Sequence, residues 1–321
     1  MVQKTLIITS GDPAGIGPEI IQKALSNYQG HSKIIILGDK AHFSEEFIAS
    51  FDVILPISSK LPENNYKSVF YHLDFEVGIT SGKPHINYAQ KVVRIIHTAT
   101  LLCLEDPKNT ALVTAPIQKD TIASHIDNFH GHTDYIRDIC SEYYDKNFTA
   151  VMMLTSPELK VIPLTVHIPY KDVPHHINYN IFKKTVAVLH KDLQEKYNIP
   201  NPHIAIAGLN PHAGDNGILG LEEEELIIPI INRLKRDYNV SGPYAADGMF
   251  HKKARASYDA ALCMYHDQAL IPIKTIAFDE GVNTTLGLPI IRTSPDHGTA
   301  LAIAGKNLAD PSAMMLSLIH I

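Results

Sequence analysis

The sequence contains few cysteines, and no two of them are close together. Its 321 residues include only Cys103, Cys140 and Cys263, and none of these forms a CxxC pair. Three cysteines cannot all be joined to one another in disulfide bonds, and a structural zinc site usually draws on paired cysteines. The sequence therefore argues against a disulfide scaffold and favours a cytoplasmic protein.

Long apolar runs and basic clusters are also missing. No run approaches the roughly 20 residues that a membrane-spanning helix needs, and Met1 leads almost directly into a strand-like stretch, without the pattern of a signal peptide. The 28 basic and 34 acidic residues give a net charge of −6, with no basic stripe. We therefore expect neither a membrane nor a nucleic acid as partner.

Familiar nucleotide and protease motifs are absent as well. The segment Ser10–Glu19 (SGDPAGIGPE) is rich in glycine, but its spacing fits neither G-x-G-x-x-G nor a P-loop. A phosphate-binding turn and a tight crossover without a ligand both stay open. The absence of H-E-x-x-H disfavours a zincin hydrolase.

Short apolar runs alternate with longer segments of helical period. The predicted strands are 6–8, 34–37, 111–114, 150–154 and 204–206, and the predicted helices are 18–26, 89–104, 181–197 and 221–236. The runs are apolar on both faces, as strands of a covered parallel sheet are. The pattern predicts an α/β protein, and we expect residues 1–321 to form one catalytic unit of two interleaved lobes.

Three histidines follow apolar runs that are far apart in the sequence. His167 follows 161–166, His212 follows 205–211, and His266 follows 260–265. Ligands bind at the carboxyl ends of strands in open α/β sheets, so these imidazoles are candidates for one site. Three neutral imidazoles favour Zn²⁺ or a similar ion, with a position left for substrate.

Other polar residues suggest alternatives and additions. His130 and His132 form a rival metal pair, although Gly131 also permits a turn that presents His132 and Thr133 to a substrate; a plain surface loop is the third possibility. His175 and His176 are weaker candidates. Lys274, Asn283 and Arg292 stand among apolar neighbours and together suit a small anion, whereas singly each cation would extend to solvent.

These motifs resemble the 4-hydroxythreonine-4-phosphate dehydrogenase family of pyridoxal phosphate biosynthesis. The resemblance rests on GDPAGIGPE (11–19), GHT (131–133), NPHAG (210–214), MYHDQ (264–268), GVN (281–283), TLGLP (285–289), IRTS (291–294) and DHGTA (296–300). It runs in order from residue 5 to about residue 310. Residue 248 is Gly where relatives more often carry Thr, so the surroundings of Asp247 depart from the family pattern.

The resemblance implies roles for eight residues. The implied metal ligands are His167, His212 and His266, and the implied substrate contacts are His132, Thr133, Lys274, Asn283 and Arg292. Zn is the first choice of divalent metal, with Mg, Co or Mn as alternatives. The family builds its active site across a homodimer, with metal ligands from both chains, so a monomer should be inactive.

A wider similarity concerns the fold and the cofactor. The segment Asp296–Lys306 is similar to the adenine-side loop of isocitrate and isopropylmalate dehydrogenases, which have two α/β/α lobes with a cleft between them. This similarity implies that His297, Gly298 and Thr299 bind NAD or NADP, so the missing G-x-G-x-x-G does not exclude the cofactor. A helix start capped by Thr299 is the alternative.

The implied reaction is that of a metal-dependent oxidoreductase. NAD would take a hydride from the hydroxyl-bearing carbon of 4-phosphohydroxy-L-threonine, and the resulting β-keto acid would lose CO₂ to give 3-amino-2-oxopropyl phosphate. Asp247 and Asp267 are candidates for the proton acceptor, although each is equally suited to orienting a histidine. The alternatives are the same chemistry on 4-phosphoerythronate, a phosphate acetyltransferase and a non-catalytic metal-binding protein.

Overall fold

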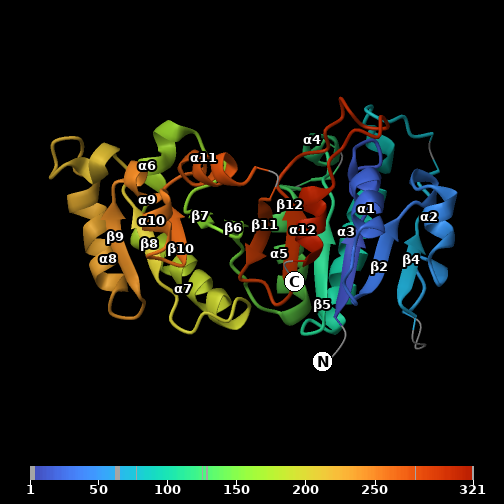
Figure 1. The fold of residues 1–321 in the computed structure, drawn as a ribbon, viewed down its shortest axis with the longest axis horizontal. Helices are drawn as coiled ribbons and strands as arrows, with labels where there is room; N and C mark the ends of the chain where they lie inside the picture. Colours follow the sequence, from blue (N-terminus) through green and yellow to red (C-terminus); the bar gives the residue numbers. More distant parts are fainter. Residues whose placement is uncertain are drawn as a thin grey trace. The chain divides into compact units, whose positions relative to one another are not determined.

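The computed structural model describes residues 4–61, 66–76, 78–124, 126–127, 129–278 and 280–319. Strands and helices alternate along the chain (Figure 1), which confirms the predicted α/β class. The chain divides into two compact units, of which the first joins Met1–Ala150 to Leu288–Ile321 and the second is Val151–Gly287. The first unit therefore combines the two ends of the sequence.

The strands of the first unit are paired in the order β3–β4–β2–β1–β5–β12. All neighbouring pairs in this order are parallel. The strands are β1 (Thr5–Thr9), β2 (Lys33–Gly38), β3 (Val53–Pro56), β4 (Ser68–His72), β5 (Thr110–Thr114) and β12 (Ile291–Pro295). Their carboxyl ends share one edge, so side chains that follow them can converge there.

Helices cover both faces of this sheet, which is why its strands are apolar on both sides. Ile7 of β1 belongs to the apolar cluster beneath α3 and α5, whereas its neighbours Leu6 and Ile8 belong to the cluster beneath α1 and α12. Figure 1 shows α12, in red, beside α1, in blue. The helices are α1 (Gly17–Ser26), α2 (Glu45–Ala49), α3 (Ala89–Glu105), α4 (Lys119–Ala123), α5 (His132–Tyr144) and α12 (Ser312–Ile319), with 3₁₀ turns at Lys40–His42 and Ile86–Tyr88.

The second unit has strands in the order β11–β6–β7–β10–β8–β9. They are β6 (Val151–Thr155), β7 (Lys160–Pro163), β8 (Ile204–Ala207), β9 (Val240–Tyr244), β10 (Ala260–Cys263) and β11 (Val282–Leu286). The neighbouring strands β7, β10, β8 and β9 pair in parallel. In contrast, β6 is antiparallel to both β7 and β11. The expectation of a parallel strand at 150–154 was therefore wrong, because only residues 156–159 connect β6 to β7 and a parallel crossover needs a longer connection.

The helices of the second unit also lie on both faces of its sheet. An apolar cluster includes α7 and α8, and a second one includes α11 and Met249. The helices are α6 (Val173–His176), α7 (Tyr179–Glu195), α8 (Ile228–Leu234), α9 (Ala246–Met249), α10 (Lys252–Arg255) and α11 (His266–Ile276), with 3₁₀ turns at Tyr170–Asp172 and Pro211–Gly214. Within the described residues, no helix is long and apolar enough to cross a membrane.

One predicted helix is divided. The segment 221–236 begins with a π-helical turn at Glu223–Ile227 and continues as α8. Pro229 lies in the first turn of α8 and has no N–H to donate to the preceding turn. Single π turns inside helices are frequent at functional sites.

Candidate functional site

The three predicted metal ligands follow three neighbouring strands. The strands β7, β10 and β8 are adjacent and parallel. His167 comes four residues after β7, His266 begins α11 directly after β10, and His212 lies in the 3₁₀ turn after β8. The structure thus places each imidazole at the same edge of the second unit.

Two of these imidazoles form a pair. The ring centroids of His167 and His266 are 5.9 Å apart with an interplanar angle of 43°. Two imidazoles that bind one Zn²⁺ at about 2.1 Å have centroids about 5–6 Å apart, so the pair fits two positions of one coordination sphere. His266 Nδ1 lies 2.7 Å from Asp267 Oδ1, which fixes the ring and leaves Nε2 for a ligand. This contact supports the orienting role of Asp267.

His212 is not part of this pair. Within the described residues of one chain, no three His, Cys, Asp or Glu side chains are arranged to hold a metal. The rival pair His130 and His132 therefore belongs to no such group among these residues. His212 is exposed, and its backbone has φ +54. Within one chain, the described residues therefore bring His167 and His266 together without His212.

Two polar side chains that the sequence analysis missed hold the segments carrying His212 and His266. Gln268 Nε2 donates to Gly208 O at 2.8 Å, and its Oε1 accepts from Met264 N at 2.7 Å. It therefore ties the loop after β8 to the end of β10. Glu223 accepts hydrogen bonds from the same loop. Only the MYHDQ motif gave a signal for Gln268.

The two candidate proton acceptors line one pocket. Asp247 in α9 and Asp267 in α11 border a space of about 440 Å³ whose other walls are mainly apolar, including Phe250, Tyr265 and Ile271. Asp247 is exposed. Both residues therefore border a space in the second unit that is large enough for a small substrate.

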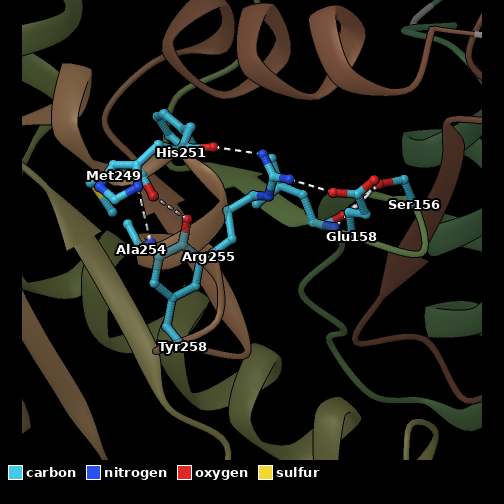
Figure 2. Close-up of polar contacts among 9 residues, drawn as sticks. Ser156, Glu158, Met249, His251, Ala254, Arg255 and Tyr258 are labelled. Atoms are coloured by element: carbon cyan, nitrogen blue, oxygen red, sulfur yellow. Dashed lines mark hydrogen bonds and ion pairs between the residues drawn. The ribbon is translucent and has the colours of Figure 1, made fainter.

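The turn that carries Asp247 is anchored from the following residues. Tyr258 Oη donates to Met249 O at 2.8 Å (Figure 2). Arg255 Nη1 donates to Phe250 O at 2.7 Å. Arg255 also forms an ion pair with Glu158, on the connection between β6 and β7. These contacts fix the chain directly after Asp247.

A separate polar cluster lies in the first unit. Arg292 of β12 is only 3% exposed, and its Nη2 donates to Thr114 Oγ1 of β5 at 2.7 Å. His132 begins α5, where Gly131 has φ +127, so this segment is a helix start rather than a plain loop. The Nε2 atom of His132 is buried, and the described residues give it no hydrogen-bond partner. A buried guanidinium beside an unsatisfied imidazole suits an anionic ligand.

The electrostatics of this cluster keep His132 neutral. Burial lowers the pKa of His132 well below 6.5, and the nearby charge of Arg292 lowers it further. Burial also lowers the pKa of Arg292 to about 10, so the guanidinium stays charged at neutral pH. The imidazole can therefore donate to or accept from a ligand without changing charge between pH 6 and 8.

The other predicted substrate contacts are divided between the units. Thr133 follows His132 in α5 of the first unit. Lys274 in α11 and Asn283 in β11 belong to the second unit and are half-buried. The Lys274 ammonium lies 5.9 Å from the centre of the Phe278 ring. Lys274 is thus half-buried and Arg292 is buried, so neither of the two predicted cationic contacts is fully exposed.

The predicted cofactor segment packs on the glycine-rich turn after β1. Thr299 O accepts from Ile16 N at 3.0 Å, and Thr299 Oγ1 donates to Gln118 Oε1 at 3.0 Å. A Cβ on Gly15 would lie 2.9 Å from Thr299 Cβ, so glycine is required for this approach. His297 and Gly298 do not share this packing: His297 is exposed, and nothing lies within 4 Å of a Cβ built on Gly298.

A pocket of about 620 Å³ lies beside this turn. It is lined by Gly15, Glu19, Lys23, Gly305 and Asn307, among others. Asp12, in the same turn, is buried and accepts from Ala14 N at 2.9 Å and Tyr88 Oη at 2.9 Å. Burial raises its pKa, and these hydrogen bonds act in the opposite direction. These hydrogen bonds hold the backbone of the turn beside the pocket in place.

In the second unit, imidazoles and carboxylates follow the carboxyl ends of parallel strands, and in the first unit a buried guanidinium lies in β12. Each of these features is typical of an α/β enzyme that binds small polar ligands. The family model described as "Pyridoxal phosphate biosynthetic protein PdxA" matches residues 29–320. The chain belongs to this family, which confirms the resemblance of its motifs.

Relatives with a specific name match nearly the whole chain. A 4-hydroxythreonine-4-phosphate dehydrogenase of Zymomonas mobilis is 42% identical and covers 98% of this chain and 94% of its own. The enzyme of the same name from Roseobacter denitrificans is 43% identical and covers 97% of this chain and 94% of its own. The crystal structure of that enzyme from Klebsiella pneumoniae has a TM-score of 0.81 and 30% identity, and covers 99% of this chain and 98% of that one.

Proposed function

We propose that this chain oxidises 4-phosphohydroxy-L-threonine with NAD in pyridoxal 5'-phosphate biosynthesis. The product is a β-keto acid that loses CO₂ to give 3-amino-2-oxopropyl phosphate. The observation that carries the proposal is the full-length match to relatives named for this activity, at 42% and 43% identity. The substrate is a small phosphorylated hydroxy acid, and the buried cluster of the first unit suits its anionic end.

Arg292 and His132 are the proposed core of the anion site. Arg292 offers a fixed, buried fork of donors that matches phosphate or carboxylate. His132, held neutral by burial and by Arg292, supplies a hydrogen bond through its unsatisfied Nε2. Thr133, next to His132, is a further proposed contact of this unit, and Lys274 and Asn283 are the substrate contacts proposed for the second unit. Binding of the remote anion positions the reactive carbon, which is how such groups contribute to the rate.

His167, His266 and His212 are the proposed ligands of one divalent metal per site. The spacing of the first two rings, and the carboxylate of Asp267 on His266, fit a catalytic zinc centre. Mg, Co and Mn are alternatives. When bound, the metal supplies Lewis acidity toward the oxygen of the substrate hydroxyl. Asp247, in the same pocket as Asp267, is the proposed acceptor of the hydroxyl proton.

The active enzyme is proposed to be a homodimer with a shared active site. The single chain brings only two of the three imidazoles together. Large apolar side chains near them are exposed, notably Ile218 at 77%, Ile271 at 64% and Tyr170 at 68%. Exposed apolar surface beside a functional site is typical of a protein interface. A second copy would cover this surface and deliver His212.

NAD, or NADP, is proposed to bind along the glycine-rich turn. The support is the packing of Thr299 on Gly15 and the adjoining pocket. The proposed contacts are His297, Gly298 and Thr299, and the cofactor accepts the hydride. We propose a cytoplasmic location, in keeping with the small number of cysteines, of which Cys103, Cys140 and Cys263 are all buried.

Following NADH formation with purified protein tests the proposal. We expect turnover with 4-phosphohydroxy-L-threonine that chelation abolishes and Zn²⁺ restores. A kcat/KM on 4-phosphoerythronate at least as high would contradict the assigned substrate. Turnover that survives complete metal removal would contradict the metal centre.

A further inference from the structure

The loop that carries His212 has an unusual backbone. Residues 212–217 all have positive φ, and four of them, His212, Ala213, Asp215 and Asn216, are not glycine. Each such residue costs about 1 kcal/mol or more relative to the right-handed region. A run of this kind persists only where surrounding contacts determine it, so something has to hold the loop in this conformation.

Glu223 is the side chain best placed to hold it. It is only 1% exposed, and Oε1 accepts from Leu209 N at 2.7 Å and from Asn210 N at 2.8 Å. Oε2 accepts from Asn210 Nδ2 at 2.9 Å. Three N–H donors from the two residues before Pro211 thus converge on one carboxylate. Charged acceptors form the stronger hydrogen bonds of proteins.

The loop is shaped to let this carboxylate in. A Cβ on Gly214 would lie 2.8 Å from Glu223 Oε2, and a Cβ on Gly208 would lie 3.1 Å from Glu223 Oε1. Glycine on both sides of His212 therefore permits the close approach. Glu223 is the first residue of the π-helical turn Glu223–Ile227, so this turn positions its carboxylate against the loop.

We propose that Glu223 is the positioning residue of His212, setting where the imidazole stands without touching metal or substrate. This rests on the proposed function only in taking His212 as a metal ligand. Partners of this kind orient a ligand in advance, and their loss typically lowers metal affinity about 10- to 100-fold. Glu222 shares only the Asn210 side chain, whose Nδ2 donates to its Oε2 at 2.7 Å, and the backbone N–H groups of Leu209 and Asn210 donate to Glu223. Glu224 and Glu225 are exposed.

The test is a titration of the metal-free protein with Zn²⁺ alone. Glu223→Gln keeps the side-chain volume but turns an N–H₂ group toward N–H donors, and we expect the dissociation constant to rise about 10- to 100-fold. Glu225→Gln, on the same turn but exposed, is the matched control and should bind as the wild type does. An unchanged constant for Glu223→Gln, or a loss of thermal stability with unchanged affinity of the folded protein, would overturn the proposal.

Two further measurements separate the possible failures. His212→Ala must also weaken Zn²⁺ binding; if it does not, the ligand assignment fails rather than the positioning role. Hydrogen exchange of the unmodified protein needs no variant: the amides of Leu209 and Asn210 should be protected as strongly as those of β8. Rapid exchange at both would show that Glu223 does not hold the loop.

Discussion

His212→Ala is expected to reduce metal-dependent turnover to below about 1% of the wild type while leaving the protein folded. The imidazole is exposed, so its removal takes away little packing, but it takes away one of the three proposed ligands. The measurement is NADH formation in saturating Zn²⁺, with circular dichroism to establish folding. His175→Ala is the matched control, because His175 is an exposed imidazole of the same unit and should be dispensable.

Full turnover with stoichiometric zinc in His212→Ala would contradict the ligand assignment. A comparable loss in His175→Ala would instead show that the assay responds to any removed imidazole. The two variants therefore separate a specific ligand from a general effect of histidine.

Arg292→Ala is expected to raise KM for the phosphorylated substrate about 100-fold, with a smaller change in kcat. The buried guanidinium is the proposed donor group of the anion site, so its loss should remove binding made before and during the reaction. Arg137→Ala, on the surface of α5 where Arg137 pairs with Asp134 and Asp138, should leave KM unchanged. An unchanged KM in Arg292→Ala would remove Arg292 from the anion site.

A second measurement shows that Arg292 acts on His132. The pKa of His132 is lowered first by burial and then by the charge of Arg292. In Arg292→Gln the second cause is gone, so the pKa should rise yet stay below 6.5, because the ring is still buried. An NMR titration of the His132 ring in both proteins measures this. An equal pKa of His132 in the two proteins would contradict an electrostatic effect of Arg292 on this ring.

The α/β class and several elements could be predicted because a strand that is buried on both faces is a continuous apolar run in the sequence. The apolar runs at 6–8, 34–37 and 204–206 are strands, and each predicted ligand follows a strand. The antiparallel pairing of β6 was missed because its residues are as apolar as those of a parallel strand. Only the short connection to β7 distinguishes the two, and it is a matter of geometry rather than composition.

Residue type was enough to predict candidate site residues, but their burial and hydrogen bonds depend on the fold and were missed. Arg292 taken alone was expected to reach solvent, yet it is buried on Thr114. Glu223 stands in a run of four glutamates, which reads as a solvated helix face. It does lie in register with Ile227, Ile230 and Leu234 on the apolar stripe, so helical periodicity gave a signal that was not used.

Mixing two inactive variants tests the shared metal centre most directly. His212→Ala and His266→Ala are each expected to be inactive alone. If His212 and His266 of one site come from different chains, half of the dimers in an equal mixture are mixed, and each of these has one intact site, so about one quarter of wild-type activity should return. If the mixture stays inactive after subunit exchange is verified, the imidazoles do not meet across two copies, and the proposed centre is contradicted.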